Sequence, residues 1–225
     1  MGKAVSRGQA LQISGRVAMQ VDWDALDGDR LQGEVIDLTP EQFKERFTAF
    51  LKNGAQFIIG EPKVIRTKFF DPARFIGKDW RIWRGSANGD GLTGEKDTDP
   101  RSQDIAEIEI ARILFETCLR EGENSITGEE KLSRLKKAGH IRLGGNTFLG
   151  LWEDYQANKE NSVLEWLYRS AKITYMDFFG DVLRSPGGRR RVLYLYRFDD
   201  GSWFWRVHWL GFDWVVDDSS AGLAS

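Results

Sequence analysis

The chain has 225 residues, 41% of them hydrophobic and 29% charged, which is enough to bury the core of one sizeable domain or two small ones. Its 14 Phe and nine Trp residues exclude a wholly disordered chain. A formal charge of −2 gives no basic field for nucleic acid or an anionic membrane. One cysteine and two histidines exclude an intrachain disulfide and a Cys/His zinc cluster.

The sequence contains no apolar run long enough to span a membrane, and its first 25 residues lack the core of a signal peptide. We therefore expect a cytoplasmic protein, with export by another route as the alternative. Nothing in the composition indicates a bound cofactor, so we expect none.

The first 60 residues are predicted to be helical. Apolar residues between Gln9 and Val21 recur with a period close to that of a helix. A second helix is expected to begin at Thr39, because Thr39-Pro40-Glu41-Gln42 combines an N-cap, a proline suited to the first turn and the glutamine of a capping box. Gly54 is the expected end of this helix.

The middle of the chain gives mixed signals. We expect a short strand over 57–59, a long loop over 77–100 and a helix over 101–121. A capping box at Thr127 predicts a further short helix that ends at Gly139.

The last third predicts two more helices and then strands. The expected helices cover 146–155 and 162–169, and the expected strands cover 173–179, 192–196 and 203–209, with a hairpin turn at 199–202. The predicted fold class is therefore α+β, in which a helical N-terminal portion over 1–60 precedes a second domain over 61–225.

An Asp- and Gly-rich loop over 86–97 carries two motifs of low specificity. Its G-x-G-x-x-G sequence lacks the preceding strand and immediate helix that a dinucleotide site needs. The same loop has the alternating oxygen ligands of a calcium loop, but Ser86 stands where Asp is wanted and Asp97 is shorter than the usual Glu. We expect a solvated loop, and an enzyme or metal-binding protein that uses this loop is the alternative function.

Other candidate chemistry is sparse. Neither His140 nor His208 is placed by its surroundings beside a nucleophile. The basic tip at 189–191, with Arg184 nearby, has too few charges for a nucleic-acid footprint. We therefore predict no catalytic residue, no metal site and no membrane partner, and nucleic-acid binding through Arg184, Arg189, Arg190 and Arg191 is the weaker alternative.

The C-terminal segment is unusual because four tryptophans fall within twelve residues. Tryptophans at alternate positions of the strand expected over 203–209 would share one buried face. Phe204, Arg206 and His208 would then point to the other face. An aromatic ring, a guanidinium and an imidazole are typical of binding hot spots, so this pattern favours a binding surface on a tryptophan-braced scaffold.

The composition of this segment also indicates a specific codon history. Lys, Glu, Gln and Met together number 38, and none of them follows Met176. An asparagine codon mutated only at its adenines still ends in C or T, so it can encode Phe, Arg, Val, His, Gly, Asp or Ser but never Lys, Glu, Gln, Met or Trp. The residues between the tryptophans belong to this reachable set, whereas the tryptophan codon contains no adenine.

With these features, the sequence resembles the variable proteins of diversity-generating retroelements. In that family, adenine-directed mutagenic reverse transcription rewrites a C-terminal segment on a C-type-lectin fold. The similarity is closest in the frame W-x-W-x-x-x-W-L-x-x-x-W at 203–214, and it covers about residues 75–225. The resemblance implies a C-type-lectin-like domain over 61–225, with a small twisted antiparallel sheet, flanking helices and a hypervariable segment at about 197–220. The sugar-binding loops and disulfides of animal lectins and the reactive cysteines of formylglycine-generating enzymes are missing here.

The resemblance also implies roles for individual residues of a non-enzymatic binding protein, whose unknown ligand we expect to be a protein or another macromolecular surface. The scaffold residues would be Trp203, Trp205, Trp209, Leu210 and Trp214. The variable, ligand-binding residues would be Phe204, Arg206, Val207, His208, Gly211, Phe212, Val215, Val216, Asp217, Asp218 and Ser219. Asp213 stays unassigned, because related frames often keep an Asp at this position.

Overall fold

The computed structural model describes residues 37–52 and 63–224, which belong to two compact units, Met1–Lys52 and Asn53–Ser225. In the first unit, helix α3 (Pro40–Lys52) begins with the predicted capping box. The Thr39 N–H donates to the Gln42 side chain at 3.0 Å, and the Gln42 N–H donates to the Thr39 hydroxyl at 3.3 Å. The helix predicted over 9–21, the strand predicted over 57–59 and the helix end at Gly54 lie outside the described residues.

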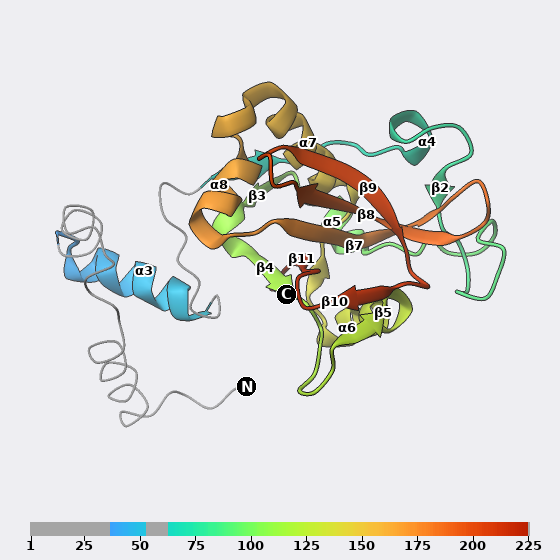
Figure 1. Ribbon diagram of the computed structural model, residues 1–225, viewed down its shortest axis with the longest axis horizontal. Coiled ribbons are helices and arrows are strands. Elements are labelled where there is room, and N and C mark those ends of the chain that lie inside the picture. Colours follow the sequence, from blue (N-terminus) through green and yellow to red (C-terminus); the bar gives the residue numbers. More distant parts are fainter. Residues whose placement is uncertain (1–36, 53–62, 225) are drawn as a thin grey trace. The chain divides into compact units, whose positions relative to one another are not determined.

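The second unit is built around a mixed sheet with the strand order β4-β11-β7-β8-β9 (Figure 1). Its strands are β4 (Ile113–Glu116), β7 (Tyr175–Arg184), β8 (Arg190–Arg197), β9 (Trp203–Trp209) and β11 (Ser220–Leu223), with β2 (Arg81–Ile82) paired to β7 and β6 (Ile141–Arg142) paired to β11. β11, the last strand of the chain, lies between β4 and β7 and runs parallel to β7, whereas the other pairs are antiparallel.

Two small strand pairs and several helices complete the α+β fold. The pairs are β1 (Val64–Arg66) with β3 (Glu107–Glu109), and β5 (Ser125–Thr127) with β10 (Asp213–Val215). The helices of this unit are α4 (Pro72–Phe75), α5 (Pro100–Gln103), α6 (Gly128–Ala138), α7 (Gly145–Asn158) and α8 (Val163–Ala171), with 3₁₀ turns at Ile110–Arg112 and Lys159–Asn161. None of the described helices is long and apolar enough to cross a membrane.

The N-cap of the capping box predicted at Thr127 is confirmed, whereas the carboxylate of Glu130 binds Arg134. The Thr127 hydroxyl accepts the N–H of Glu130 at 3.3 Å, and α6 ends at Gly139, whose φ of 80° is left-handed. These two ends depend only on neighbouring residues, which is why the sequence predicts them correctly.

The helix predicted over 101–121 is wrong. α5 ends at Gln103, and strands β3 and β4 flank a 3₁₀ turn within the remainder. Ile108 lies opposite Ile65 of β1, and Phe115 lies opposite Ala221 of β11. Partners distant in sequence therefore take this isoleucine-rich segment into sheets, and this pairing overrides its local helical pattern.

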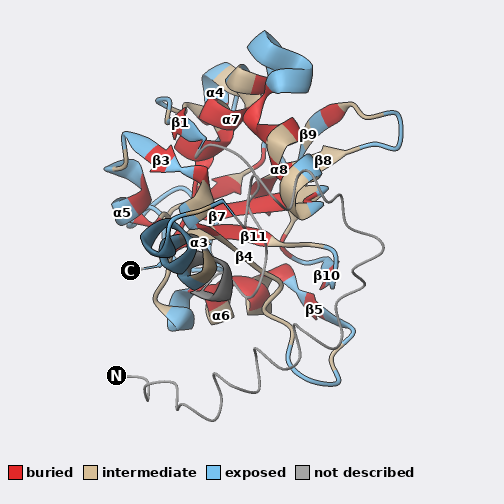
Figure 2. Ribbon diagram, turned by 90° about the vertical axis from the view of Figure 1, so that its left-hand side faces the viewer, coloured by how far each residue is buried: buried red, intermediate tan, exposed pale blue. Residues whose placement is uncertain are grey.

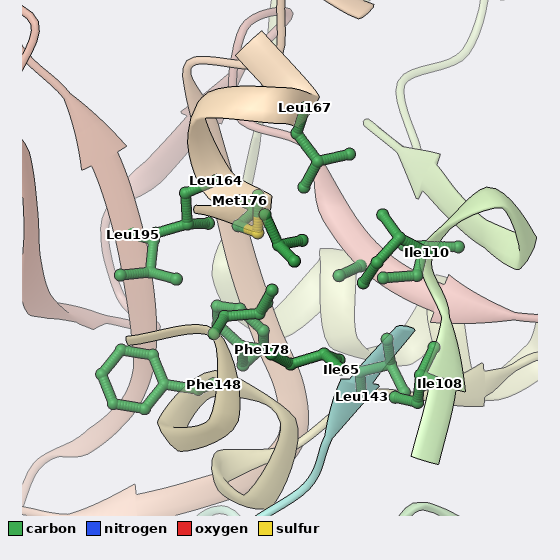
Figure 3. Packing of buried hydrophobic residues seen from close by; sticks show 14 of the residues in the cluster. Ile65, Ile108, Ile110, Leu143, Phe148, Leu164, Leu167, Met176, Phe178 and Leu195 are labelled. Atoms are coloured by element: carbon green, nitrogen blue, oxygen red, sulfur yellow. The ribbon is translucent and has the colours of Figure 1, made fainter. Parts of the chain in front are cut away.

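The main hydrophobic core lies between the sheet and helices α7 and α8 (Figure 3). Phe148 of α7 and Leu164 of α8 are completely buried, as are Met176, Phe178 and Leu195 of the strands beneath them. Figure 2 shows this burial along β7 and α7, with exposed loops around them. The two helices therefore cover much of one face of the sheet.

The opposite face of the sheet is only partly covered. α6 contributes Leu132 and Leu135 to a second buried cluster, which also contains Phe179, Val192 and Trp214. This cluster covers one end of β7 and β8. The other end of the same face has no helix packed on it within the described chain, and this end carries the candidate site.

Candidate binding surface

The register of β8 with β9 gathers aromatic side chains on the uncovered part of the sheet. The two strands pair without interruption from Arg191↔Trp209 to Arg197↔Trp203. Because side chains alternate along a strand, every second residue of β9 joins every second residue of β8 on this side. We call this surface the aromatic face, and its members are Tyr175, Tyr194, Tyr196, Phe198, Phe204, Arg206, His208 and Phe212.

The rings of the aromatic face contact one another in sequence across the strands. The rings of Tyr175 and Tyr194 stack with centroids 5.0 Å apart, and the ring of Phe198 lies edge-on to that of Phe204 at 5.0 Å. Phe198 and Phe204 are 47% and 42% exposed, and Phe212 is 55% exposed. Large apolar rings therefore form a continuous and accessible surface, which is uncommon on a face without a partner.

The core side of β9 is anchored by Trp203. Its side chain is buried, its indole N–H donates to Glu165 at 2.8 Å, and its backbone N–H donates to the hydroxyl of Tyr155 at 3.1 Å. Glu165 also binds Arg197 of β8 at 2.9 Å. Trp203 therefore fixes the start of β9 against both α7 and α8.

The other predicted scaffold residues differ in burial. Leu210 and Trp214 are completely buried, whereas Trp205 and Trp209 are half-buried. Trp205 packs on Phe75 and Phe148 of the main core. Trp209 instead lies at the edge of the sheet, where the Arg189 guanidinium is 4.7 Å from its ring centroid.

The structure exposes most of the predicted ligand-binding residues. The exposed ones are Phe204, Arg206, Gly211, Phe212, Val215, Val216 and Asp217, and the half-buried ones are His208, Asp218 and Ser219. The placement of Val207 corrects the prediction: its side chain packs against the main core, because its odd position puts it on the same face as Trp203 and Trp205. Val207 is therefore excluded from the candidate surface.

A buried polar cluster beneath the surface was missed by the sequence analysis. Asp177 of β7 accepts the indole N–H of Trp214 at 2.6 Å and the hydroxyl of Tyr175 at 3.0 Å, and it lies 3.5 Å from the ammonium of Lys131. Burial raises the pKa of Asp177 to about 7 and lowers the pKa of Lys131. The available sequence signal was a single carboxylate within the apolar strand Tyr-Met-Asp-Phe-Phe.

His208 connects this buried cluster to the aromatic face. Its imidazole lies against the ring of Trp214, with centroids 4.0 Å apart, and its Nδ1 is 3.4 Å from the hydroxyl of Tyr175. Burial lowers the pKa of His208, so the imidazole is neutral near pH 7. A substitution of His208 would therefore directly alter the contacts of the buried cluster.

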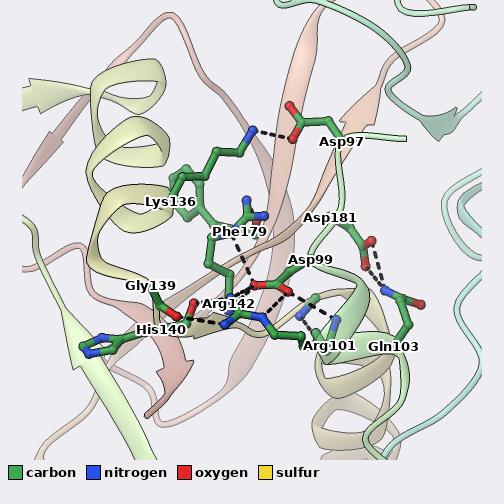
Figure 4. A network of polar contacts seen from close by, with 12 residues as sticks. Asp97, Asp99, Arg101, Gln103, Lys136, Gly139, His140, Arg142, Phe179 and Asp181 are labelled. Atoms are coloured by element: carbon green, nitrogen blue, oxygen red, sulfur yellow. Dashed lines mark hydrogen bonds and ion pairs between the residues drawn. The ribbon is translucent and has the colours of Figure 1, made fainter. Parts of the chain in front are cut away.

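The Asp and Gly residues of the loop over 86–97 have roles in the fold of the domain. The carboxylate of Asp97 binds Lys136 at 2.7 Å and Arg190 at 2.9 Å (Figure 4 shows Lys136). Burial alone would raise the pKa of Asp97, but these two cations hold it below its ordinary value. A Cβ at Gly91 would lie 2.5 Å from the ring of Trp83, so glycine is required there for packing. Among the described residues, no group of three or more His, Cys, Asp or Glu could hold a metal ion.

The basic tip is likewise engaged within the protein. Arg190 is buried and binds both Asp97 and Glu129, while the Arg184 guanidinium donates to the carbonyl of Asp90 at 2.6 Å. These contacts leave Arg189, which lies over Trp209, as the exposed arginine of the tip. A phosphate backbone would therefore meet few available charges here.

The remaining buried charges hold the loop before α5 against the sheet. The carboxylate of Asp99 accepts from Arg101 at 2.8 Å and from the backbone N–H of Arg142 at 3.1 Å. Asp181 accepts from Gln103 and from the N–H of Gly145, which begins α7 (Figure 4). Because these carboxylates are occupied by donors of the same domain, they form a structural network.

Comparison with known proteins assigns no family: no protein-family model matches the chain, and neither a curated protein nor a solved structure matches it. Function is therefore inferred from the aromatic face and the adjoining C-terminal segment.

Proposed function

We propose that this chain is a non-enzymatic binding protein whose ligand contacts the aromatic face and the adjoining residues 211–219. The proposal rests on one observation, which is that exposed side chains and buried tryptophans alternate along the C-terminal segment. Phe204 and Phe212 are exposed, whereas Trp203 and Trp214 are buried and hydrogen-bonded. A scaffold that is already rigid loses little conformational entropy when its exposed side chains bind a ligand.

The chemistry of the surface favours a macromolecular partner, in particular a protein. Tyr, Phe and Arg are enriched at the centres of protein interfaces, and the rings here lie on a sheet face. Asp199, Asp200 and Asp217 are exposed in turns, Asp213 is exposed at the start of β10, and Arg206 is the exposed cation among the members of the aromatic face. These carboxylates oppose the phosphates of a nucleic acid, and they suit a partner with basic groups around an apolar centre.

We also propose that the exposed positions are diversified by adenine-directed mutagenic retrohoming on a C-type-lectin-like domain. Two observations support this. The residues of the segment match the codons reachable from asparagine codons by adenine mutation. The tryptophans, whose codon contains no adenine, include the most deeply buried side chains of the segment.

Sequencing of the 3′ end of the gene and its flanking DNA tests the proposal. We expect a near-copy of codons 197–225 whose differences from the gene coincide with adenines of the copy. The differing codons should include 204, 206, 208 and 212 and should spare 203, 210 and 214. A fixed gene without such a copy nearby would overturn the diversification and return the segment to an ordinary β-hairpin.

A further inference from the structure

The buried pair of Lys131 and Asp177 lies directly beneath residues 213–219. Neither side chain has exposed surface, although the two come from different elements, α6 and β7. The Asp177 carboxylate receives the Lys131 ammonium and the Trp214 indole on one oxygen and the Tyr175 hydroxyl on the other. An isolated charge at this depth would be strongly unfavourable, so each member depends on its partners.

Both members of the pair also hold the backbone of this segment. The N–H of Asp177 donates to the carbonyl of Ser219 at 2.8 Å, and the Lys131 ammonium donates to the carbonyl of Asp218. Together with the indole of Trp214, three residues of the segment are bound to two buried residues of the scaffold. The segment thus depends on the pair at both of its ends.

The internal contacts of the segment are short-range. The Val215 N–H donates to the Asp218 carboxylate at 2.9 Å, and the Asp218 N–H donates back to the Val215 carbonyl at 3.1 Å. β10 has three residues and pairs with β5, and an isolated two-stranded pair is marginal in water. These internal contacts shape a turn. Beyond the short β10–β5 pair, its position on the domain depends on Trp214, which packs in the second buried cluster and donates to Asp177, and on the contact of Lys131 with the Asp218 carbonyl.

We propose that Lys131 and Asp177 are positioning residues of the binding surface, a role that rests on the proposed function: the pair holds 214–219 in place, and its loss opens this segment while the sheet stays folded. Removing one partner leaves a buried charge without compensation, whereas removing both leaves none. The two residues should therefore be coupled, and the double variant should be milder than either single one.

Hydrogen exchange of the full chain, followed by mass spectrometry, tests this without any ligand. In Asp177→Asn and in Lys131→Met we expect the amides of 214–219 to exchange at least about tenfold faster than in the wild type, with the β7–β8 amides unchanged except that of residue 177, which donates to Ser219. The double variant Lys131→Met/Asp177→Asn should restore part of the lost protection. Because no ligand is involved, failure here is separate from failure of the gene-sequencing experiment.

Glu165→Gln is the matched control. Glu165 is also a buried carboxylate that accepts a tryptophan indole N–H and binds a cation, but it lies on the other face of the sheet. We expect this variant to raise exchange near Trp203 and α8 and to leave 214–219 as in the wild type. Equal opening of 214–219 in Glu165→Gln would show a general loss of stability and overturn the proposal.

A measurement on the wild type decides the case if a single variant fails to fold. NMR exchange of the Trp214 indole N–H and the Asp177 backbone N–H should give the same opening constant, because both are released when the segment opens. Constants that differ by more than about tenfold would show separate openings and overturn the proposal. Wild-type protection of 214–219 in both folded single variants would overturn it as well.

Discussion

The indole N–H of Trp214 donates to the buried carboxylate of Asp177 at 2.6 Å. Trp203 makes the equivalent contact to Glu165 at 2.8 Å, but it belongs to the main core on the opposite face of the sheet. A buried indole N–H requires an acceptor, so each contact determines how its tryptophan lies. These two tryptophans are fixed points, and the exposed residues of the C-terminal segment lie between and around them.

The different burial of Trp214 and Trp209 predicts that their substitution by alanine lowers the free energy of unfolding by very different amounts. Trp214→Ala should lower the free energy of unfolding by about 3–5 kcal/mol, because it removes a completely buried ring and one of the three donors to the Asp177 carboxylate. Trp209→Ala should cost roughly 1–2 kcal/mol, because Trp209 is half-buried beneath Arg189. Urea unfolding monitored by circular dichroism measures both, and equal losses would contradict the assignment of Trp209 to the edge.

Substitutions on the aromatic face should separate binding from stability. Phe212→Ala and Arg206→Ala should change the unfolding free energy by less than about 1 kcal/mol, because both side chains are exposed. The same urea experiment measures this, with Trp214→Ala as the destabilised reference. Losses as large as that of the reference would mean that these side chains support the fold instead of a ligand.

The Asp177 carboxyl predicts a defined pH dependence. Burial raises its pKa from 3.8 to about 7, so the folded state binds the proton more tightly than the unfolded state. The stability contributed by this group is full below pH 3.8 and is lost as the pH rises through about 7.

Comparison with Asp177→Asn measures the titration of Asp177 together with its coupled partner Lys131, because asparagine does not titrate and groups that Asp177 does not affect contribute alike to both proteins. The unfolding free energy of the wild type minus that of the variant should fall between about pH 4 and pH 7 and level off above that. Parallel pH profiles for the two proteins would show that Asp177 keeps an ordinary pKa.

Gly128 is predicted to be irreplaceable for a steric reason. A Cβ at this position would lie 2.2 Å from the ring of Trp214, so Gly128→Ala should lower the unfolding free energy by about 2–3 kcal/mol through overpacking. Gly187→Ala is the control, since no atom lies within 4 Å of a Cβ there. Thermal unfolding should show a lowered midpoint for the first variant and little change for the second.

Calcium should not stabilise the protein through the loop over 86–97. Asp97, which would supply the last ligand, already binds Lys136 and Arg190. Thermal unfolding with millimolar calcium and with EDTA should therefore give the same midpoint. A calcium-induced rise of the midpoint that is absent in Asp90→Asn would support the alternative function of this loop.

The features that depend on neighbouring residues can be predicted from local sequence patterns. The capping box at Thr39, the N-cap at Thr127 and the hairpin between β8 and β9 are local, and alternation along 203–209 separated Phe204 from Trp203. The same alternation applies to Val207, whose place on the core side follows from its parity once the strand is known.

The features that join distant segments depend on tertiary contacts, which local sequence patterns do not predict. Strands β3 and β4 form within the segment 101–121, which was expected to be a helix, because β1 and β11 supply their partners. The buried cluster of Lys131, Asp177 and Trp214 comes from three separate parts of the chain. Burial and pairing are properties of where segments meet, and neither the pKa of a carboxylate nor the edge position of Trp209 is encoded in its immediate neighbours.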